Sequence, residues 1–240
     1  MSKKIGSFES LTLNITEPMK ANFDLVTLKN ISLFVGANGT GKTFILVNVF
    51  AISMIANGYI VSNGQFNKEG AQFIYDNCFT EQNIDGTIVG NFSEGVIVEL
   101  KFEKGKIQTM AVLNTGGITE IIQVKFFSSQ MRTFDAINMY LKMRAMTPGN
   151  TMEEKVTGMI KSFKLYDVMY LEHLIVKMPL KVDDKMKEFL KGFDYEEDVT
   201  EFNVDLTKGE FYATINNEIK YLSALGKGHQ SIFNMLMGMS

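Results

Sequence analysis

The chain has 240 residues, a formal net charge of −3 and 45% hydrophobic residues, enough for one large α/β domain or two small ones with a packed core. The near-neutral charge excludes a general attraction to nucleic acid, and the one cysteine, Cys78, excludes an internal disulfide and is expected to be an ordinary buried or half-buried thiol. No run of about 18 apolar residues and no amino-terminal apolar signal is found, so we expect a cytoplasmic protein without a membrane partner.

The first sixty residues predict strands followed by a helix. Residues 7–15, "SFESLTLNI", alternate apolar and polar side chains, which predicts a half-exposed strand. Two more strands are predicted between residues 22 and 35, and the second of them is apolar enough to be covered on both faces. After a glycine-rich loop, the sequence from Lys42 predicts a buried helix that ends near Asn57 and Gly58.

The rest of the chain divides into β, helical and β patterns. Residues 85–130 predict an antiparallel meander with turns at "SEG", "KGK" and "NTGG". Residues 131–190 have apolar side chains three or four positions apart, which predicts helices with methionine as core filler. Residues 200–222 predict a second meander with turns at 208–209 and 216–217, and a glycine-rich turn then opens a short apolar helix.

The loop "GANGTGKT", residues 36–43, matches the phosphate-binding pattern G-x-x-x-x-G-K-[ST] at every fixed position. A chance match is expected in about one chain in a hundred of this length, and the preceding strand and following helix make it rarer still. Gly36 and Gly41 let the backbone wrap closely around phosphate. Lys42 supplies a charge for the β- and γ-oxygens, and the Thr43 hydroxyl ligates Mg²⁺. The alternative is a turn without a ligand, but a lysine in the first turn of an apolar helix has little structural reason to be there.

The segment "NISLFVGANGTGKT", with Asn38 before Gly39, resembles the ATPase heads of the ABC, SMC and RecF superfamily. The likeness is greatest to the AAA-like ABC ATPases related to the OLD family and to bacterial defence systems. It implies an α/β P-loop NTPase of the ABC-ATPase type, in which a mixed sheet carries an antiparallel β subdomain and a helical subdomain. One ATP-binding domain would span residues 1–240, with a P-loop core at 1–60, the β subdomain at 85–130, the helical subdomain at 131–195 and a hairpin with a signature-like segment at 199–240.

The resemblance also implies the ligands, ATP and Mg²⁺, and a dimer. Residues 222–233, "LSALGKGHQSIF", stand where the superfamily keeps the signature loop that closes over the γ-phosphate bound to a second head. The usual serine is Lys227 here, and a glycine-rich turn before a packing helix is the simpler alternative. Gln130 is a candidate Q-loop glutamine, although an exposed loop glutamine is an equal interpretation. The predicted nucleotide contacts are Gly36, Asn38, Gly39, Thr40, Gly41, Lys42, Thr43, Gln130, Lys227 and Gly228, with Thr43 also on the metal.

A Walker B strand with its Asp-Glu pair is not found before Ser240, and neither Glu99 nor Glu172 has the form to replace it. We therefore expect a fragment of a longer ATPase or, as the alternative, a nucleotide-binding interaction module without hydrolysis. A P-loop kinase or ring ATPase is disfavoured because such enzymes use several arginines, and the chain has Arg132 and Arg144 alone. The predicted function is ATP binding, with hydrolysis in the complete protein by a nucleotide-gated homodimer. The catalytic residues stay unknown, and DNA or an effector protein is left open as a further partner.

Overall fold

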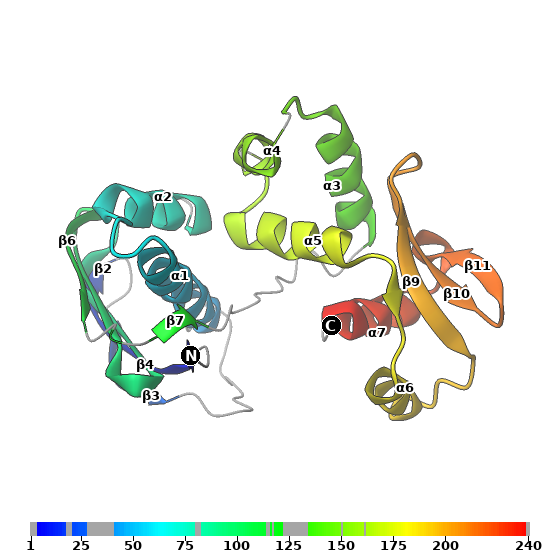
Figure 1. The fold of residues 1–240 in the computed structure, drawn as a ribbon, viewed down its shortest axis with the longest axis horizontal. Helices are drawn as coiled ribbons and strands as arrows, with labels where there is room; N and C mark the ends of the chain where they lie inside the picture. Colours follow the sequence, from blue (N-terminus) through cyan, green and yellow to red (C-terminus); the bar gives the residue numbers. More distant parts are fainter. Residues whose placement is uncertain are drawn as a thin grey trace. The chain divides into compact units, whose positions relative to one another are not determined.

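The computed structural model describes residues 4–17, 21–27, 41–79, 83–113, 116, 118–121, 134–149, 151–160 and 162–238. The described chain is a mixed α/β structure with two antiparallel sheets, and it divides into two compact units, Met1–Phe126 and Phe127–Ser240 (Figure 1). The boundary falls close to the predicted junction between the antiparallel and helical subdomains. That these units are subdomains of one ATP-binding domain stays a prediction.

The first unit is built on a five-stranded antiparallel sheet with the order β3-β2-β4-β5-β6. Its strands are β2 (Phe8–Glu17), β3 (Ala21–Thr27), β4 (Asp85–Phe92), β5 (Ile97–Glu103) and β6 (Lys106–Leu113), with a short 3-10 turn η1 (Ser93–Gly95) between β4 and β5. Leu13 pairs with Ile88 and Ile88 with Leu100, and all three side chains are fully buried on one face of the sheet. The strands predicted at 7–15 and between 85 and 113 are therefore confirmed. The predicted strand at 31–35 lies outside the described residues.

Two helices, α1 (Lys42–Val61) and α2 (Lys68–Cys78), cover the buried face of this sheet. A Cβ atom added at Gly90 in β4 would lie 2.3 Å from Ile52 Cγ2, so α1 approaches the strand as closely as a glycine permits. α2 has no counterpart among the predicted elements. Cys78, in its last turn, is buried as expected.

The predicted end of α1 at Asn57 and Gly58 is wrong, because the helix continues to Val61. Gly58 stays helical beside the ring of Phe66, whose Cδ2 would lie 2.9 Å from an added Cβ atom. The helix stops at Asn63 (φ 52°) and Gly64 (φ 83°), where the Gly64 amide donates to the Tyr59 carbonyl at 2.8 Å. An Asn-Gly pair thus ends the helix as predicted, but it is the pair at 63–64 and not the pair at 57–58.

A second correction concerns the strand predicted near residue 120 as the last strand of the meander. β7 (Ile118–Ile121) instead pairs in parallel with β1 (Lys4–Gly6), forming a separate two-stranded sheet. The Ile121 amide donates to Asn57 Oδ1 at 3.2 Å, which fastens β7 to α1. Residues 122–130 of the predicted segment lie outside the described ones.

The sequence has no uninterrupted run of about 18 apolar residues, but α1 is long and apolar enough to cross a membrane. Its mean hydropathy is 2.0 over 18 residues. It is the one such helix among the residues that the structure describes. Inside the structure, 67% of that window is buried. Core helices of water-soluble proteins pass the same test, so this feature does not assign the chain to a membrane, and the cytoplasmic location stays a prediction.

The second unit combines five helices with a four-stranded antiparallel sheet of order β11-β10-β9-β8. The helices are α3 (Phe134–Met146), α4 (Met152–Met159), α5 (Leu165–Lys177), α6 (Asp184–Lys191) and α7 (Lys227–Gly238). The strands are β8 (Leu180–Lys181), β9 (Val199–Asp205), β10 (Glu210–Ile215) and β11 (Glu218–Tyr221), and a 3-10 turn, η3 (Leu222–Ala224), precedes α7. The predicted helical region and second meander are confirmed.

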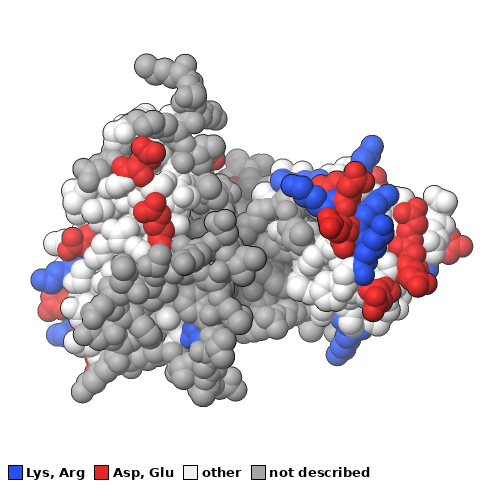
Figure 2. Space-filling model, turned by 90° about the horizontal axis from the view of Figure 1, so that it is seen from below, with Lys and Arg blue, Asp and Glu red and all other residues white. Residues whose placement is uncertain are grey.

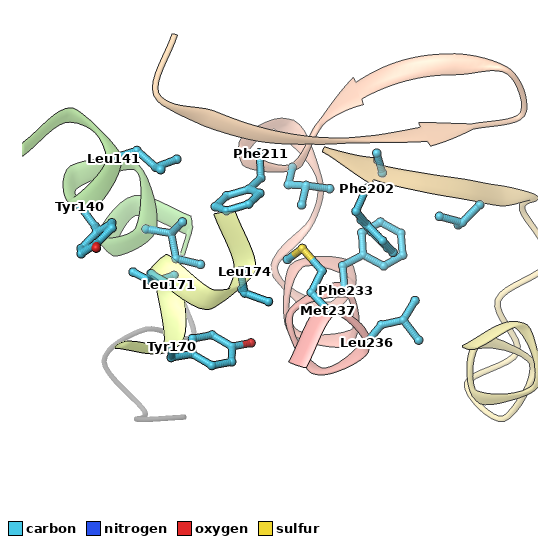
Figure 3. Close-up of a cluster of buried hydrophobic side chains, with 14 of the residues drawn as sticks. Tyr140, Leu141, Tyr170, Leu171, Leu174, Phe202, Phe211, Phe233, Leu236 and Met237 are labelled. Carbon is cyan, nitrogen blue, oxygen red and sulfur yellow. The ribbon is translucent and has the colours of Figure 1, made fainter. Parts of the chain in front are cut away.

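The core of the second unit lies between one face of this sheet and helices α3, α5 and α7 (Figure 3). The sheet contributes Phe202 and Phe211, and α7 contributes Phe233, whose ring meets that of Phe202 at 5.2 Å between centroids. All three side chains are at most 1% exposed. This packing holds the α7 helix against the sheet and leaves its first residues at the surface.

Candidate functional site

Of the predicted phosphate contacts in the glycine-rich loop, the structure describes Gly41, Lys42 and Thr43. The remaining predicted contacts of the first half of the chain lie outside the described residues, namely Gly36, Asn38, Gly39, Thr40 and Gln130. The geometry of the candidate site is therefore that of the loop's last residues and of the start of α1.

Gly41 adopts a left-handed conformation, with φ 83° and ψ 6°, directly before α1 begins. Side chains other than glycine's strain the backbone in this region, which explains the glycine at this fixed position of the motif. Lys42 is the first helical residue and is partly exposed, and Thr43 is exposed. The Thr43 side chain thus lies at the surface at the end of the loop, and that of Lys42 lies partly so.

The first turn of α1 lacks the usual local stabilisation. Gly41 provides no side-chain cap, and no acidic residue lies in the first turn. The first amides of a helix have no partner within the helix, and the helix dipole makes this end positive. Such a helix start is suited to an anionic ligand.

Tertiary contacts with α2 support this turn instead. The Phe44 ring lies 5.3 Å from that of Phe79, just beyond α2. Asn48, fully buried in α1, donates from Nδ2 to the Phe44 carbonyl at 2.8 Å and accepts at Oδ1 from the Tyr75 hydroxyl at 3.0 Å. Burial raises the pKa of Tyr75 well above its ordinary value, and Cys78 adds to the shift, so the hydroxyl stays a neutral donor.

The sequence contains a signal for α2 that the predicted elements do not include. Ala71, Ile74, Tyr75 and Cys78 are buried at helical spacing. Asn67 precedes them and caps the helix, since its side chain accepts from the Gly70 amide at 3.1 Å. Recognising this pattern identifies the helix, although it does not identify the partner of Tyr75.

The signature-like residues lie at the start of α7, in the second unit. Lys227 and Gly228 are exposed, and a Cβ atom added at Gly228 would meet nothing within 4 Å. Their neighbours make internal contacts: Gln230 Nε2 donates to the Leu225 carbonyl at 2.8 Å, and the His229 ring lies 5.4 Å from that of Tyr195. The turn is therefore held by its other side chains, while Lys227 and Gly228 face outward.

Glu172, one of the carboxylates compared with a Walker B residue, belongs to a buried network in the second unit. It accepts from the Tyr140 hydroxyl at 2.6 Å and from Arg144 Nε at 2.5 Å and Nη2 at 3.1 Å. Burial raises the pKa of Tyr140, with a further contribution from the hydrogen bond to Glu172, and that same carboxylate raises the pKa of Arg144. The network joins α3 to α5 and explains Glu172 as a structural residue.

Within the described ranges, no group of three or more His, Cys, Asp or Glu side chains is placed to hold a metal ion. A Mg²⁺ site of the predicted kind does not need such a group, since Thr43 would supply one ligand and the nucleotide phosphates and water would supply others. The metal site stays a prediction.

No protein-family model, curated protein or solved structure matches the chain. The resemblance to ABC, SMC and RecF heads therefore depends on the sequence motifs, and the P-loop fold remains a prediction beyond the mixed α/β architecture described above.

Proposed function

We propose that the chain binds ATP with Mg²⁺ at the loop that ends in Gly41, Lys42 and Thr43, as the head of an ABC/SMC-like ATPase. One observation carries the proposal. The second fixed glycine of the phosphate-binding pattern, Gly41, is left-handed, and the buried helix that starts at the next residue has no side-chain cap. The lysine, the helix dipole and the first amides of α1 together favour bound phosphate.

The basic residues favour an ATPase head over a phosphoryl-transferring kinase. Kinases surround the transferred group with positive charge. Arg144, one of the chain's two arginines, is already engaged by Glu172 in a largely buried ion pair. That arginine is unavailable to a nucleotide without breaking the α3–α5 network.

A second candidate is a nucleotide-binding module that changes partners without hydrolysing ATP. The observation in its favour is the state of Glu172, whose carboxylate accepts hydrogen bonds from Tyr140 and Arg144. A carboxylate engaged in this way is a poor general base for water. ATP turnover by the complete protein, lost in Lys42→Ala, distinguishes the two candidates because the module binds ATP without turnover.

We further propose that the head acts as a homodimer in which Lys227 and Gly228 of one copy contact the nucleotide of the other. Gly228 is exposed, and its helical backbone leaves room for a phosphate to approach. Because the contact is reciprocal, each copy uses both surfaces and the dimer closes on itself. ATP then favours the dimer because only the γ-phosphate bridges the copies.

Nucleic acid is a weaker candidate for the face of the second unit that Figure 2 shows. In Figure 2, acidic and basic side chains are interleaved over the second unit. DNA-binding surfaces gather lysine and arginine on one face, which neutralises phosphates along the duplex. DNA and effector proteins stay open as partners of the whole protein.

The test is calorimetric titration of the 240-residue chain with ATP and Mg²⁺. Lys42→Ala is expected to weaken binding by about a hundredfold or more, since it removes a charge-assisted contact to phosphate. Lys68→Ala is the matched control, because Lys68 is also the first residue of a helix in the same unit. Equal affinities of Lys42→Ala and the unsubstituted chain would overturn the proposed function.

A further inference from the structure

We propose that α2 sets the nucleotide affinity of the loop by positioning the first turn of α1 through the Asn48–Tyr75 hydrogen bond. The inference rests on the proposed function, and it assigns Asn48 and Tyr75 as positioning residues that do not touch the ligand. Three features of the first unit lead to it.

The first feature is the absence of a side-chain cap from Gly41 at the turn that carries Lys42 and Thr43. Gly41 has no side chain to cap the helix, and its left-handed backbone ends the helical hydrogen-bond pattern on the N-terminal side of Lys42. An uncapped helix end frays unless other contacts hold it. What holds the residues that follow therefore contributes to the position of the backbone that carries Lys42 and Thr43.

The second feature is the hydrogen-bonded chain that provides this support. Asn48 lies one turn after Phe44, and its Nδ2 donates to the Phe44 carbonyl at 2.8 Å. The Tyr75 hydroxyl donates to Asn48 Oδ1 at 3.0 Å, which turns the amide so that Nδ2 faces that carbonyl. Phe44 follows Thr43 in the chain, so the Asn48 side chain links α2 to the turn, beside the ring contact between Phe44 and Phe79.

The third feature is the rigidity of α2 itself. The Tyr75 ring stacks on Phe79 with centroids 5.4 Å apart and meets Phe102 of β5 at 4.9 Å. Three residues before Tyr75 in α2, Gln72 Nε2 donates to the Gly105 carbonyl at 3.0 Å, and the Ile107 amide donates to Gln72 Oε1 at 2.7 Å. α2, whose Tyr75 donates to Asn48, is thus fastened to the hairpin between β5 and β6.

These contacts make a specific prediction about Tyr75→Phe, which removes one hydroxyl and keeps the ring contacts. The Asn48 amide loses the partner that orients it, and the first turn of α1 samples other positions. We expect ATP to bind about three- to tenfold more weakly, the effect of one net hydrogen bond. Tyr59→Phe, the same change at the far end of α1, is the matched control and leaves the affinity unchanged.

A second variant separates positioning from stability. Tyr75→Phe leaves a buried amide oxygen without its donor and lowers the melting temperature. Adding Asn48→Leu removes both polar groups, so the melting temperature recovers toward that of the unsubstituted chain. Positioning of the turn is still lost, so the affinity for ATP stays low in the double variant.

The outcomes are distinguishable in calorimetry and thermal melting of the full chain. Weak ATP binding by the double variant with a recovered melting temperature supports the inference. Unchanged affinity in Tyr75→Phe, or recovery of affinity together with the melting temperature, overturns it while leaving the proposed function intact. Failure of the unsubstituted chain to bind ATP overturns the proposed function and this inference with it.

Discussion

The starts of α1 and α7 are alike in sequence and differ in what the fold requires of them. Each helix begins with a lysine that follows a glycine, Gly41-Lys42 in one and Gly226-Lys227 in the other. Gly41 is left-handed and leads into a helix that is mostly buried. The α7 start is exposed, and its second glycine, Gly228, is helical with open space around it.

Because the two conformations differ, Gly41 and Gly228 give different evidence about function. The backbone at Gly41 needs glycine whether or not a ligand binds, so its left-handed conformation supports the proposed function only together with the motif and the uncapped helix start. Glycine in a helix costs up to about 1 kcal/mol relative to alanine, and no contact within the described structure needs the missing side chain of Gly228. The α7 glycine is therefore the better conformational indication that another molecule approaches the backbone.

The largest expected effect at the α7 start is that of Gly228→Asp on dimerisation. The carboxylate places a negative charge against phosphate oxygens and fills the space that the proposed contact needs. Sedimentation with ATP is expected to show dimers of the unsubstituted chain and monomers of the variant, with monomers of both in ADP.

The matched control for this charge is Asn217→Asp, in the exposed turn between β10 and β11 of the same unit. It adds the same charge without touching the α7 start and should preserve the dimer. ATP-dependent dimers that persist unchanged in Gly228→Asp would show that the turn is only a structural element.

At the α1 start, Thr43→Ala is expected to act through the metal. A lost ligand to Mg²⁺ weakens ATP binding by about tenfold or more in the presence of the metal, as other contacts to charged groups do. With a chelator in place of Mg²⁺ the two proteins should bind ATP equally. Equal losses under the two conditions would contradict the assignment of Thr43 to the metal.

A smaller effect is expected from Gly41→Ala, which forces a side chain into the left-handed region. The strain lowers the free energy of unfolding by about 1–2 kcal/mol, measured by urea titration. ATP affinity falls as well, because the strain is relieved by moving the loop away from its position before α1. A stable variant with full affinity would contradict the conformation assigned to Gly41.

Most elements with a local signal are predicted from the sequence, with α2 as an exception, and the long-range contacts are missed. β2, the strands between residues 85 and 113 and the helices of the second unit follow from their periodicity. The parallel pairing of β7 with β1 joins the two ends of the first unit, and the hydrogen bond between Asn48 and Tyr75 joins residues 27 positions apart. No local pattern specifies such contacts, since they depend on how the helices pack on the sheet.

In the candidate site, too, features with local sequence signals are predicted and features that depend on tertiary packing are not. Gly41, Lys42 and Thr43 are predicted because the phosphate-binding chemistry fixes their spacing. The end of α1 is misplaced because Asn57 and Gly58 carry a stop signal that packing against Phe66 overrides. The role of Glu172 becomes clear only from its contacts with Tyr140 and Arg144, which come from another helix.

The smallest expected effect, that of Gly228→Ala, separates the two helix starts most sharply. Alanine at this position gains up to about 1 kcal/mol in the free energy of unfolding, because it restricts the unfolded chain and meets no atom in the fold. The same methyl group stands between the helix backbone and the phosphate proposed to approach it, so ATP-dependent dimerisation weakens while the fold is strengthened. At Gly41 the same substitution lowers both the free energy of unfolding and ATP-dependent dimerisation. Urea unfolding measures the change in the free energy of unfolding for each of the two variants, and sedimentation measures the change in ATP-dependent dimerisation. A loss of stability in Gly228→Ala would mean that the fold itself needs this glycine and would remove the reason for placing a second nucleotide against it.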